Sequence, residues 1–428
     1  GVELVLPGQR IRLKPHTYSP WVRLTFRAGL GVKVRGICRF YLKEASPGFG
    51  LYLSPLNIDP ETPALPLSHP FVYAPYLAKV FGPYATLGLA EDTSALNEGV
   101  LDEEAFLAQA YDIHAERERM FFDACRKVDH GMVACVFDIT DRIQHVFWQY
   151  TQEGRGAGSQ PEPSDHDEAV EECYRRMDEM IGRVRKTLGR NDLLMVVSDH
   201  GFAAFHTCVN LNAWLRQHGF LALKDGAREC GGYFKNVDWP RTKAYALGLG
   251  GIFINQAGRE AKGIVEEGEE RLAVVRAIAE GLRELEAPGS GERVVRRMFD
   301  LRARYRGPYA ENGPDLIVGF ADGYRVSWDC VTGGFGGEVI TPNKKPWSGD
   351  HCIDPAVVPG VFFSNRPISA DRPGIIDVAP TVLDAFGIPA PSYMQGESLL
   401  ADRRAGILRS AEQEASEDGE RAEAILSP

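Results

Sequence analysis

Aspartate and histidine residues occur together at three places in the chain, each time beside a short apolar run. They are Asp141 with His145, Asp199 with His200, and Asp350 with His351. Mixed sets of carboxylates and imidazoles are ligands that Zn²⁺ and Mn²⁺ take in proteins. A single Asp-His pair is more often a solvent-facing loop, whereas three such pairs in one chain favour a site with two metal ions.

The first pair lies in the stretch "CVFDITDRIQHVFWQY", residues 135–150. If a helix begins after the apolar run, the i, i+4 spacing puts Asp141 and His145 on the same helix face. Both side chains would then face one ion. Asp138 precedes them and is a candidate for orienting a ligand through a hydrogen bond, although a helix cap is the favoured interpretation.

The other two pairs are adjacent residues. Asp199 and His200 close the apolar run "LLMVVS". Neighbouring side chains at a strand end point in different directions, so they could bind two ions roughly 4 Å apart, the spacing of two-metal sites. His351 is the third candidate ligand, and Asp350 before it is a second candidate for orienting a ligand.

Strands and helices alternate along the last three-quarters of the chain. Continuous apolar runs predict buried strands at 131–137, 193–198, 315–320 and 357–363, and helical spacing or caps predict helices at 102–127, 164–189 and 375–387. This order predicts an α/β fold with a mainly parallel sheet sandwiched by helices. Ligands of such sheets gather at the carboxyl ends of the strands, where the first two motifs are predicted to lie.

The amino-terminal segment has a different pattern. It contains short β-rich runs broken by proline and glycine, followed by the irregular stretch "NIDPETPALPLSHP". We predict a β-rich insertion or subdomain at 1–75 and an α/β metal-binding core at 76–428. The charged end of the chain, 410–428, is predicted to be a solvated helix or tail.

Composition restricts the class of partner. The 428 residues carry a formal net charge of −11, which disfavours binding to a nucleic-acid backbone but allows a small anionic substrate beside bound metal ions. No apolar run approaches the roughly 20 residues of a membrane span. Eight cysteines are scattered without a CxxC pair, a pattern of reduced thiols that favours a cytoplasmic location. Nothing in the sequence sets an oligomeric state.

Four segments together resemble one family. The segments "FDITDRIQH", "VVSDHGF", "SGDH" and "IIDVAPTVLDAFGIPAP" are similar to the type I phosphodiesterase/nucleotide pyrophosphatase family of the alkaline phosphatase superfamily. The resemblance extends over about residues 100–400. It implies an alkaline-phosphatase-like fold, two divalent metal ions, Zn²⁺ or Mn²⁺, and hydrolysis of a small-molecule phosphate ester.

The resemblance also assigns the ligands. It gives one metal ion Asp141, His145 and His351, and it gives the other Asp199 and His200. It further implies a sixth ligand, an aspartate, and a threonine or serine nucleophile from the first strand and helix of the fold. Asp59 in "LNIDPETP" and Asp92 in "GLAEDTSA" fit this role poorly, because neither follows a predicted buried strand. We therefore expect the nucleophile to lie upstream of Gly1.

Other functions stay open beside phosphate ester hydrolysis. The main alternative is a non-catalytic metal-binding or partner-binding domain that retains the scaffold without a nucleophile. Sulfatases and metal-dependent phosphoglycerate mutases of the same superfamily are less favoured. No cysteine has the C-x-P-x-R context of a sulfatase nucleophile, and the middle of the chain does not resemble the mutases.

Overall fold

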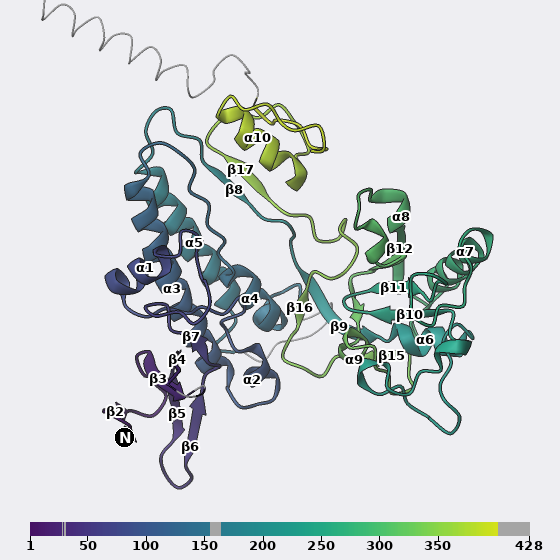
Figure 1. Ribbon diagram of the computed structural model, residues 1–428, viewed down its shortest axis with the longest axis horizontal. Helices are drawn as coiled ribbons and strands as arrows, with labels where there is room; N and C mark the ends of the chain where they lie inside the picture. Colours follow the sequence, from purple (N-terminus) through teal and green to yellow (C-terminus); the bar gives the residue numbers. More distant parts are fainter. Residues whose placement is uncertain (28, 30, 155–163, 401–428) are drawn as a thin grey trace, which may run out of the picture. The chain divides into compact units, whose positions relative to one another are not determined.

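The computed structural model describes residues 1–27, 29, 31–154 and 164–400 (Figure 1). The chain divides into two compact units. The first unit comprises Gly1–Tyr174 and Asn343–Gly349, and the second comprises Arg175–Pro342 and the described residues from Asp350 onward. The tail predicted at 410–428 lies outside the described residues.

The amino-terminal part of the first unit consists of short antiparallel strands, as its sequence predicts. They are β1 (Val2–Leu6), β2 (Gln9–Leu13), β3 (Val22–Arg27), β4 (Lys33–Cys38), β5 (Phe40–Glu44), β6 (Gly50–Leu53) and β7 (Asn57–Ile58). β1 pairs with β2, β4 with both β3 and β7, and β5 with β6. Leu13, Val22 and Leu42 are buried between these hairpins and form a small apolar core.

Helices make up the rest of the first unit. They are α1 (Tyr73–Phe81), α2 (Thr93–Asn97), α3 (Glu103–Lys127), α4 (Ile139–Phe147) and the 3₁₀ turn η1 (Trp148–Tyr150). The long helix α3 confirms the spacing-based prediction, and Asp102 caps it by accepting a hydrogen bond from the Ala105 amide at 2.8 Å. α1, α2 and α4 all pack against α3. α3 is therefore the support on which α4, the helix of the first motif, rests.

One predicted strand of the first unit is wrong. Residues 131–137 form an irregular segment instead of a buried strand, and the Val136 side chain is 76% exposed. An apolar run becomes a strand only where a neighbouring strand satisfies its backbone groups. Here the Val136 carbonyl accepts a hydrogen bond from the Arg117 guanidinium at 3.1 Å. The first motif thus follows a loop rather than a strand.

Helix α5 (Ala169–Arg185) begins in the first unit and ends in the second. It is shorter than the helix predicted at 164–189. The Ser164 hydroxyl accepts a hydrogen bond from the His166 amide and so forms a local turn before the helix. The carboxyl-terminal end is also earlier than predicted, because residues after Arg185 form turns.

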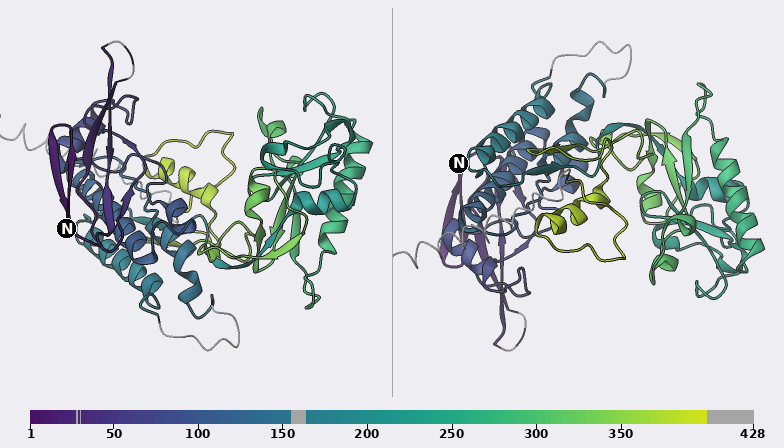
Figure 2. Two further views of the ribbon diagram at one scale, coloured as in Figure 1. Left: turned by 90° about the horizontal axis from the view of Figure 1, so that it is seen from below. Right: turned by 90° about the horizontal axis from the view of Figure 1, so that it is seen from above.

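The second unit contains a four-stranded sheet in the order β10–β11–β13–β12. Its strands are β10 (Ala244–Leu247), β11 (Gly251–Ile254), β12 (Val295–Asp300) and β13 (Leu316–Phe320), the last of which was predicted. All three pairings are antiparallel. Helix α7 (Glu269–Arg283) packs against β11 and β12 (Figure 2), and its buried Ile278 joins Ile252 and Val318 in the core of this unit.

The remaining strands form two smaller sheets. β9 (Ala203–Val209) lies between β14 (Gly323–Val326) and β15 (Ile340–Pro342), and β8 (Met195–Val197) pairs with β17 (Phe362–Ser364). The short elements that complete the described chain are β16 (Gly349–Asp350), α6 (Leu211–Gln217), α8 (Leu301–Arg304), α9 (Trp328–Val331), α10 (Val378–Ala385) and the 3₁₀ turns η2 (Gly232–Phe234), η3 (Trp239–Arg241), η4 (Ala310–Asn312) and η5 (Ile375–Asp377). The helix predicted at 375–387 is thus present as η5 and α10.

The mixed α/β class agrees with the sequence, but the predicted mainly parallel sheet does not appear among the described strands. β9 and β14 pair in parallel, whereas most other pairs are antiparallel. The cause is visible at β10 and β11, which are joined by a turn with Gly248 and Gly250 at φ of 75° and 101°. A connection this short returns the chain antiparallel.

Two further findings concern the whole described chain. In the part that the structure describes, no helix combines the length and the apolar character needed to cross a bilayer. Each of the eight cysteines carries a thiol rather than a disulfide.

Candidate metal centre

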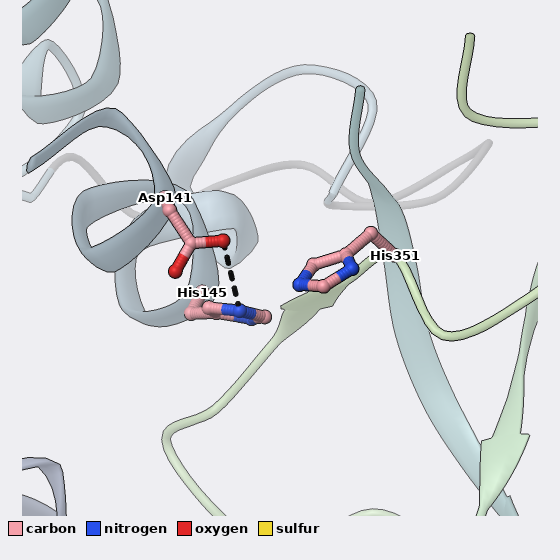
Figure 3. Close-up of side chains that lie close together, drawn as sticks. All are labelled: Asp141, His145 and His351. Carbon is pink, nitrogen blue, oxygen red and sulfur yellow. Dashed lines mark ion pairs between the residues drawn. The ribbon is translucent and has the colours of Figure 1, made fainter. Parts of the chain in front are cut away.

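Asp141 and His145 lie one turn apart on the same face of α4, as their spacing predicts (Figure 3). Asp141 Oδ1 is 3.4 Å from His145 Nε2. The imidazole is almost fully buried, with a relative exposure of 3%. A carboxylate oxygen and an imidazole nitrogen at this distance attract only if a proton or a cation lies between them.

The ring of His145 is fixed in orientation by the loop that ends at Gly349, the first residue of β16. Its Nδ1 lies 2.7 Å from the Gly349 carbonyl oxygen, which can only accept a hydrogen bond. Nδ1 therefore carries the hydrogen, which puts the lone pair of the neutral ring on Nε2, the atom that faces Asp141. The Trp347 ring stacks on the imidazole with centroids 3.7 Å apart. Metal-ligating histidines are held by this kind of backbone contact.

Hydrogen bonds tie the same loop to the end of α4. The Ser348 amide donates to the His145 carbonyl at 2.7 Å, and the Ser348 hydroxyl donates to the Val146 carbonyl at 2.9 Å. Gly349 needs to be glycine, because a Cβ there would lie 2.5 Å from the Gln144 carbonyl oxygen. His351 follows two residues later, so its Cα lies within about 7 Å of the Gly349 Cα.

The second unit brings together the other three predicted ligands. Asp199 and His200 follow β8, with Asp199 Oδ1 3.6 Å from His200 Nε2 and the Asp199 side chain 75% exposed. The His200 and His351 rings stack with centroids 3.5 Å apart and planes 8° from parallel. The stack therefore places two of the candidate imidazole ligands side by side.

Asp350 is buried and holds the backbone of its neighbours. Its Oδ1 accepts hydrogen bonds from the His351 and Cys352 amides, both at 2.8 Å. Its Oδ2 lies 2.6 Å from Arg325 Nε. The guanidinium in turn lies over the ring of Trp328, 4.5 Å from its centroid. Asp350 thus orients the turn that carries His351.

A protein-family model described as type I phosphodiesterase / nucleotide pyrophosphatase matches residues 71–329, more than half of the chain. The chain belongs to this family. The family is part of the alkaline phosphatase superfamily, so the resemblance seen in the motifs is confirmed. No curated protein matches the chain. The matched range contains the first two Asp-His motifs, whereas His351 lies beyond its end.

Two charged contacts of helix α4 were not predicted from the sequence. Arg142 forms an ion pair with Asp141 and lies 3.5 Å from the buried carboxylate of Glu91. Asp138 stands at the start of α4, but its carboxylate does not cap the helix. It accepts a hydrogen bond from Arg117 of α3 at 2.6 Å instead. The arginine of α3 is in reach because the two helices pack together, which sequence spacing does not reveal.

The sulfur of Cys352 lies beside the third motif, Asp350 and His351. Ligand atoms of Asp350, His351 and Cys352 all lie within 4.8 Å of one another. Burial, reinforced by the charge of Asp350, raises the pKa of the Cys352 thiol to about 12. Because only the thiolate binds metal strongly, and because Asp350 is engaged by Arg325, this trio is a weaker ligand set than the imidazoles and Asp141.

Asp59 and Asp92, which fit the nucleophile segment poorly by sequence, both have structural contacts. Asp59 is fully buried, accepts a hydrogen bond from the Glu61 amide at 3.0 Å and lies 3.4 Å from Arg23 Nε. Asp92 caps α2 by accepting a hydrogen bond from the Ala95 amide at 2.9 Å. These contacts give both residues a structural role.

Proposed function

We propose that this phosphodiesterase-family chain is a metal-dependent hydrolase of small-molecule phosphate esters, of the phosphodiesterase or nucleotide pyrophosphatase type. One observation carries the proposal. The Gly349 carbonyl and the Trp347 ring hold His145 so that Nε2 faces the carboxylate of Asp141. Such a pre-oriented pair of nitrogen and oxygen donors is what a catalytic metal site requires.

Two divalent ions, Zn²⁺ or Mn²⁺, fit the donor chemistry of these residues. In this proposal Asp141, His145 and His351 hold one ion, and Asp199 and His200 hold the other. Bound metal ions supply positive charge that favours attack on phosphorus and stabilises the leaving oxygen. The exposed Asp199 suits a position at the substrate side of the site.

The chain's own residues keep the proposed ligands in place. Arg142 holds the carboxylate of Asp141 through an ion pair. Asp350 holds the backbone of His351. The proposed nucleophile is a threonine or serine in a segment upstream of Gly1, together with a sixth ligand. In this proposal, residues 1–75 are an insertion into the α/β core, which begins at residue 76.

The second candidate function is a metal-binding or partner-binding domain without catalysis. One observation favours it. Asp59 and Asp92, the two aspartates considered above for the nucleophile segment, are both engaged in buried or capping contacts. The two candidates share the metal site and differ in the nucleophile.

Metal analysis and hydrolysis assays test the two candidates. The chain should retain two equivalents of Zn²⁺ or Mn²⁺ after dialysis, and the H145A/H351A variant should lose at least one. The exposed His130 supplies a matched control, because H130A should retain both ions. Equal metal content in all three proteins would rule out the ligand assignment.

Hydrolysis of bis-p-nitrophenyl phosphate separates catalysis from simple binding. We expect weak turnover by the 428 residues and strong turnover by a chain extended at its amino terminus, with H145A/H351A inactive in both. Metal binding without turnover by any extended chain would support the non-catalytic candidate. Strong turnover by the 428 residues alone would show that the nucleophile lies within them.

A further inference from the structure

A pocket of about 500 Å³ opens in the second unit and shares no lining residue with the candidate metal centre. Its lining includes Lys224, Lys235, Lys262, Phe234, Trp239 and Pro240. We propose that this pocket binds a phosphate monoester that carries a flat aromatic ring. Its volume lies in the range of small-molecule sites, and the inference does not depend on the proposed hydrolysis.

The charge of the pocket is positive, although two aspartates also line it. Arg241 pairs with both, at 2.6 Å from Asp238 and 3.1 Å from Asp225. The arginine offsets much of the carboxylate charge, and the charges of the three lysines therefore dominate. Ammonium groups are compact point charges that suit a phosphate dianion.

The apolar part of the pocket consists of aromatic rings. The lining residues Phe234 and Trp239 meet edge to face, with centroids 5.5 Å apart, and Tyr245, which is outside the lining, meets Trp239 in the same way at 5.2 Å. Val237, which is buried, completes this surface. Ring surfaces of this kind stack well on a flat aromatic ligand. A ligand with both a ring and a phosphate would therefore use both halves of the pocket.

Hydrogen bonds hold the walls of the pocket in place. The Nδ2 of the fully buried Asn255 lies between 2.8 and 3.1 Å from the carbonyl oxygens of Trp239, Thr242 and Lys262, which share its two hydrogens. The Lys224 ammonium donates to the Lys235 carbonyl at 2.8 Å. Walls that are ordered before binding reduce the entropy that a ligand must offset.

The backbone beside the pocket is strained. Tyr233 and Phe234 have φ of 55° and 57°, in the left-handed region that non-glycine residues rarely adopt. The Phe234 ring packs so closely on Gly333 that any Cβ at Gly333 would overlap it. Two consecutive strained aromatic residues persist only where the surroundings demand them, and such positions cluster at ligand sites. Phe234, the second of these residues, lines the pocket.

The test uses the full chain after chelator treatment and dialysis, with phenyl phosphate as the probe and isothermal titration calorimetry at about 0.1 M salt, where the Debye length is about 10 Å. We expect K235E/K262E to raise the Kd by about tenfold or more, a loss of ~1.4 kcal/mol or more. K186E changes an exposed lysine of the same unit outside the pocket and should leave the Kd within about twofold of wild type, as expected for a screened distant charge.

Two further comparisons test the ring and the location. Inorganic phosphate should bind more weakly than phenyl phosphate, and W239L should remove that difference without affecting phosphate binding. H145A/H351A should bind phenyl phosphate as wild type does. The proposal is overturned if phenyl phosphate does not bind, if K235E/K262E binds it normally, or if phosphate binds equally well. Loss of binding in H145A/H351A would assign the ligand to the metal centre and would also overturn it.

Discussion

Replacement of Arg325 by methionine tests how the turn that carries His351 is held. The guanidinium and the Asp350 carboxylate are both buried, with side-chain exposures of 5% and 1%, and their atoms lie 2.6 Å apart. Methionine keeps much of the apolar volume between the rings of Phe205 and Trp328 but removes the charge. The buried carboxylate then loses its ion pair with Arg325.

The magnitude follows from that burial. Removal of one partner of a buried ion pair costs about 3–5 kcal/mol. The lower end applies here, because the His351 and Cys352 amides still donate hydrogen bonds to Asp350. We expect R325M to lower the free energy of unfolding of the metal-free chain by about 3 kcal/mol, measured by urea denaturation. Because a displaced supporting contact weakens a metal ligand by roughly 10–100-fold, Zn²⁺ affinity should also fall.

The double variant R325M/D350N separates the charge from the turn. Asparagine retains an oxygen that accepts the two amide hydrogen bonds but carries no charge. We expect the double variant to recover most of the lost stability and to bind Zn²⁺ more tightly than R325M. The interpretation is refuted if the free energy of unfolding of R325M lies within about 1 kcal/mol of wild type, as for the loss of a surface ion pair. It is also refuted if R325M/D350N is as unstable as R325M.

Two other outcomes can be measured on the same protein. G349A should lower the free energy of unfolding by about 1–3 kcal/mol, since its Cβ would lie 2.5 Å from the Gln144 carbonyl oxygen. The control is G336A, because Gly336 has open space around it. Equal stability of the two variants would contradict the close approach at Gly349. Burial raises the pKa of Asp315, but hydrogen bonds from Arg259, the Ile254 amide and Arg271, together with the charge of Arg259, outweigh burial and leave the pKa below its usual value. The resulting stabilisation is complete above an unfolded-state pKa of about 4 and is lost as pH falls through the lower folded-state pKa. Acid unfolding of D315N should therefore show a shallower pH dependence than wild type, and an unchanged slope would refute this.

Local patterns were predicted well, since they depend on residues close together in sequence. Helix α3 starts after the capping residue Asp102 and carries the apolar spacing that predicted it. The i, i+4 spacing of Asp141 and His145 likewise placed both on one face of α4. The strand predicted at 131–137 failed, because an apolar run does not specify whether a neighbouring strand is present to pair with it.

The sequence by itself determined the family and the residue types of the candidate metal centre, since both are contained in short motifs. Only the tertiary structure showed what orients those residues. Trp347 and Gly349 lie about 200 positions from His145 in the chain. Even so, the Trp347 ring stacks on the His145 ring, and the Gly349 carbonyl accepts its hydrogen bond. Arg325 likewise reaches Asp350 from a separate strand. Contacts of this kind form only when distant segments pack together, so residue type and spacing cannot specify them.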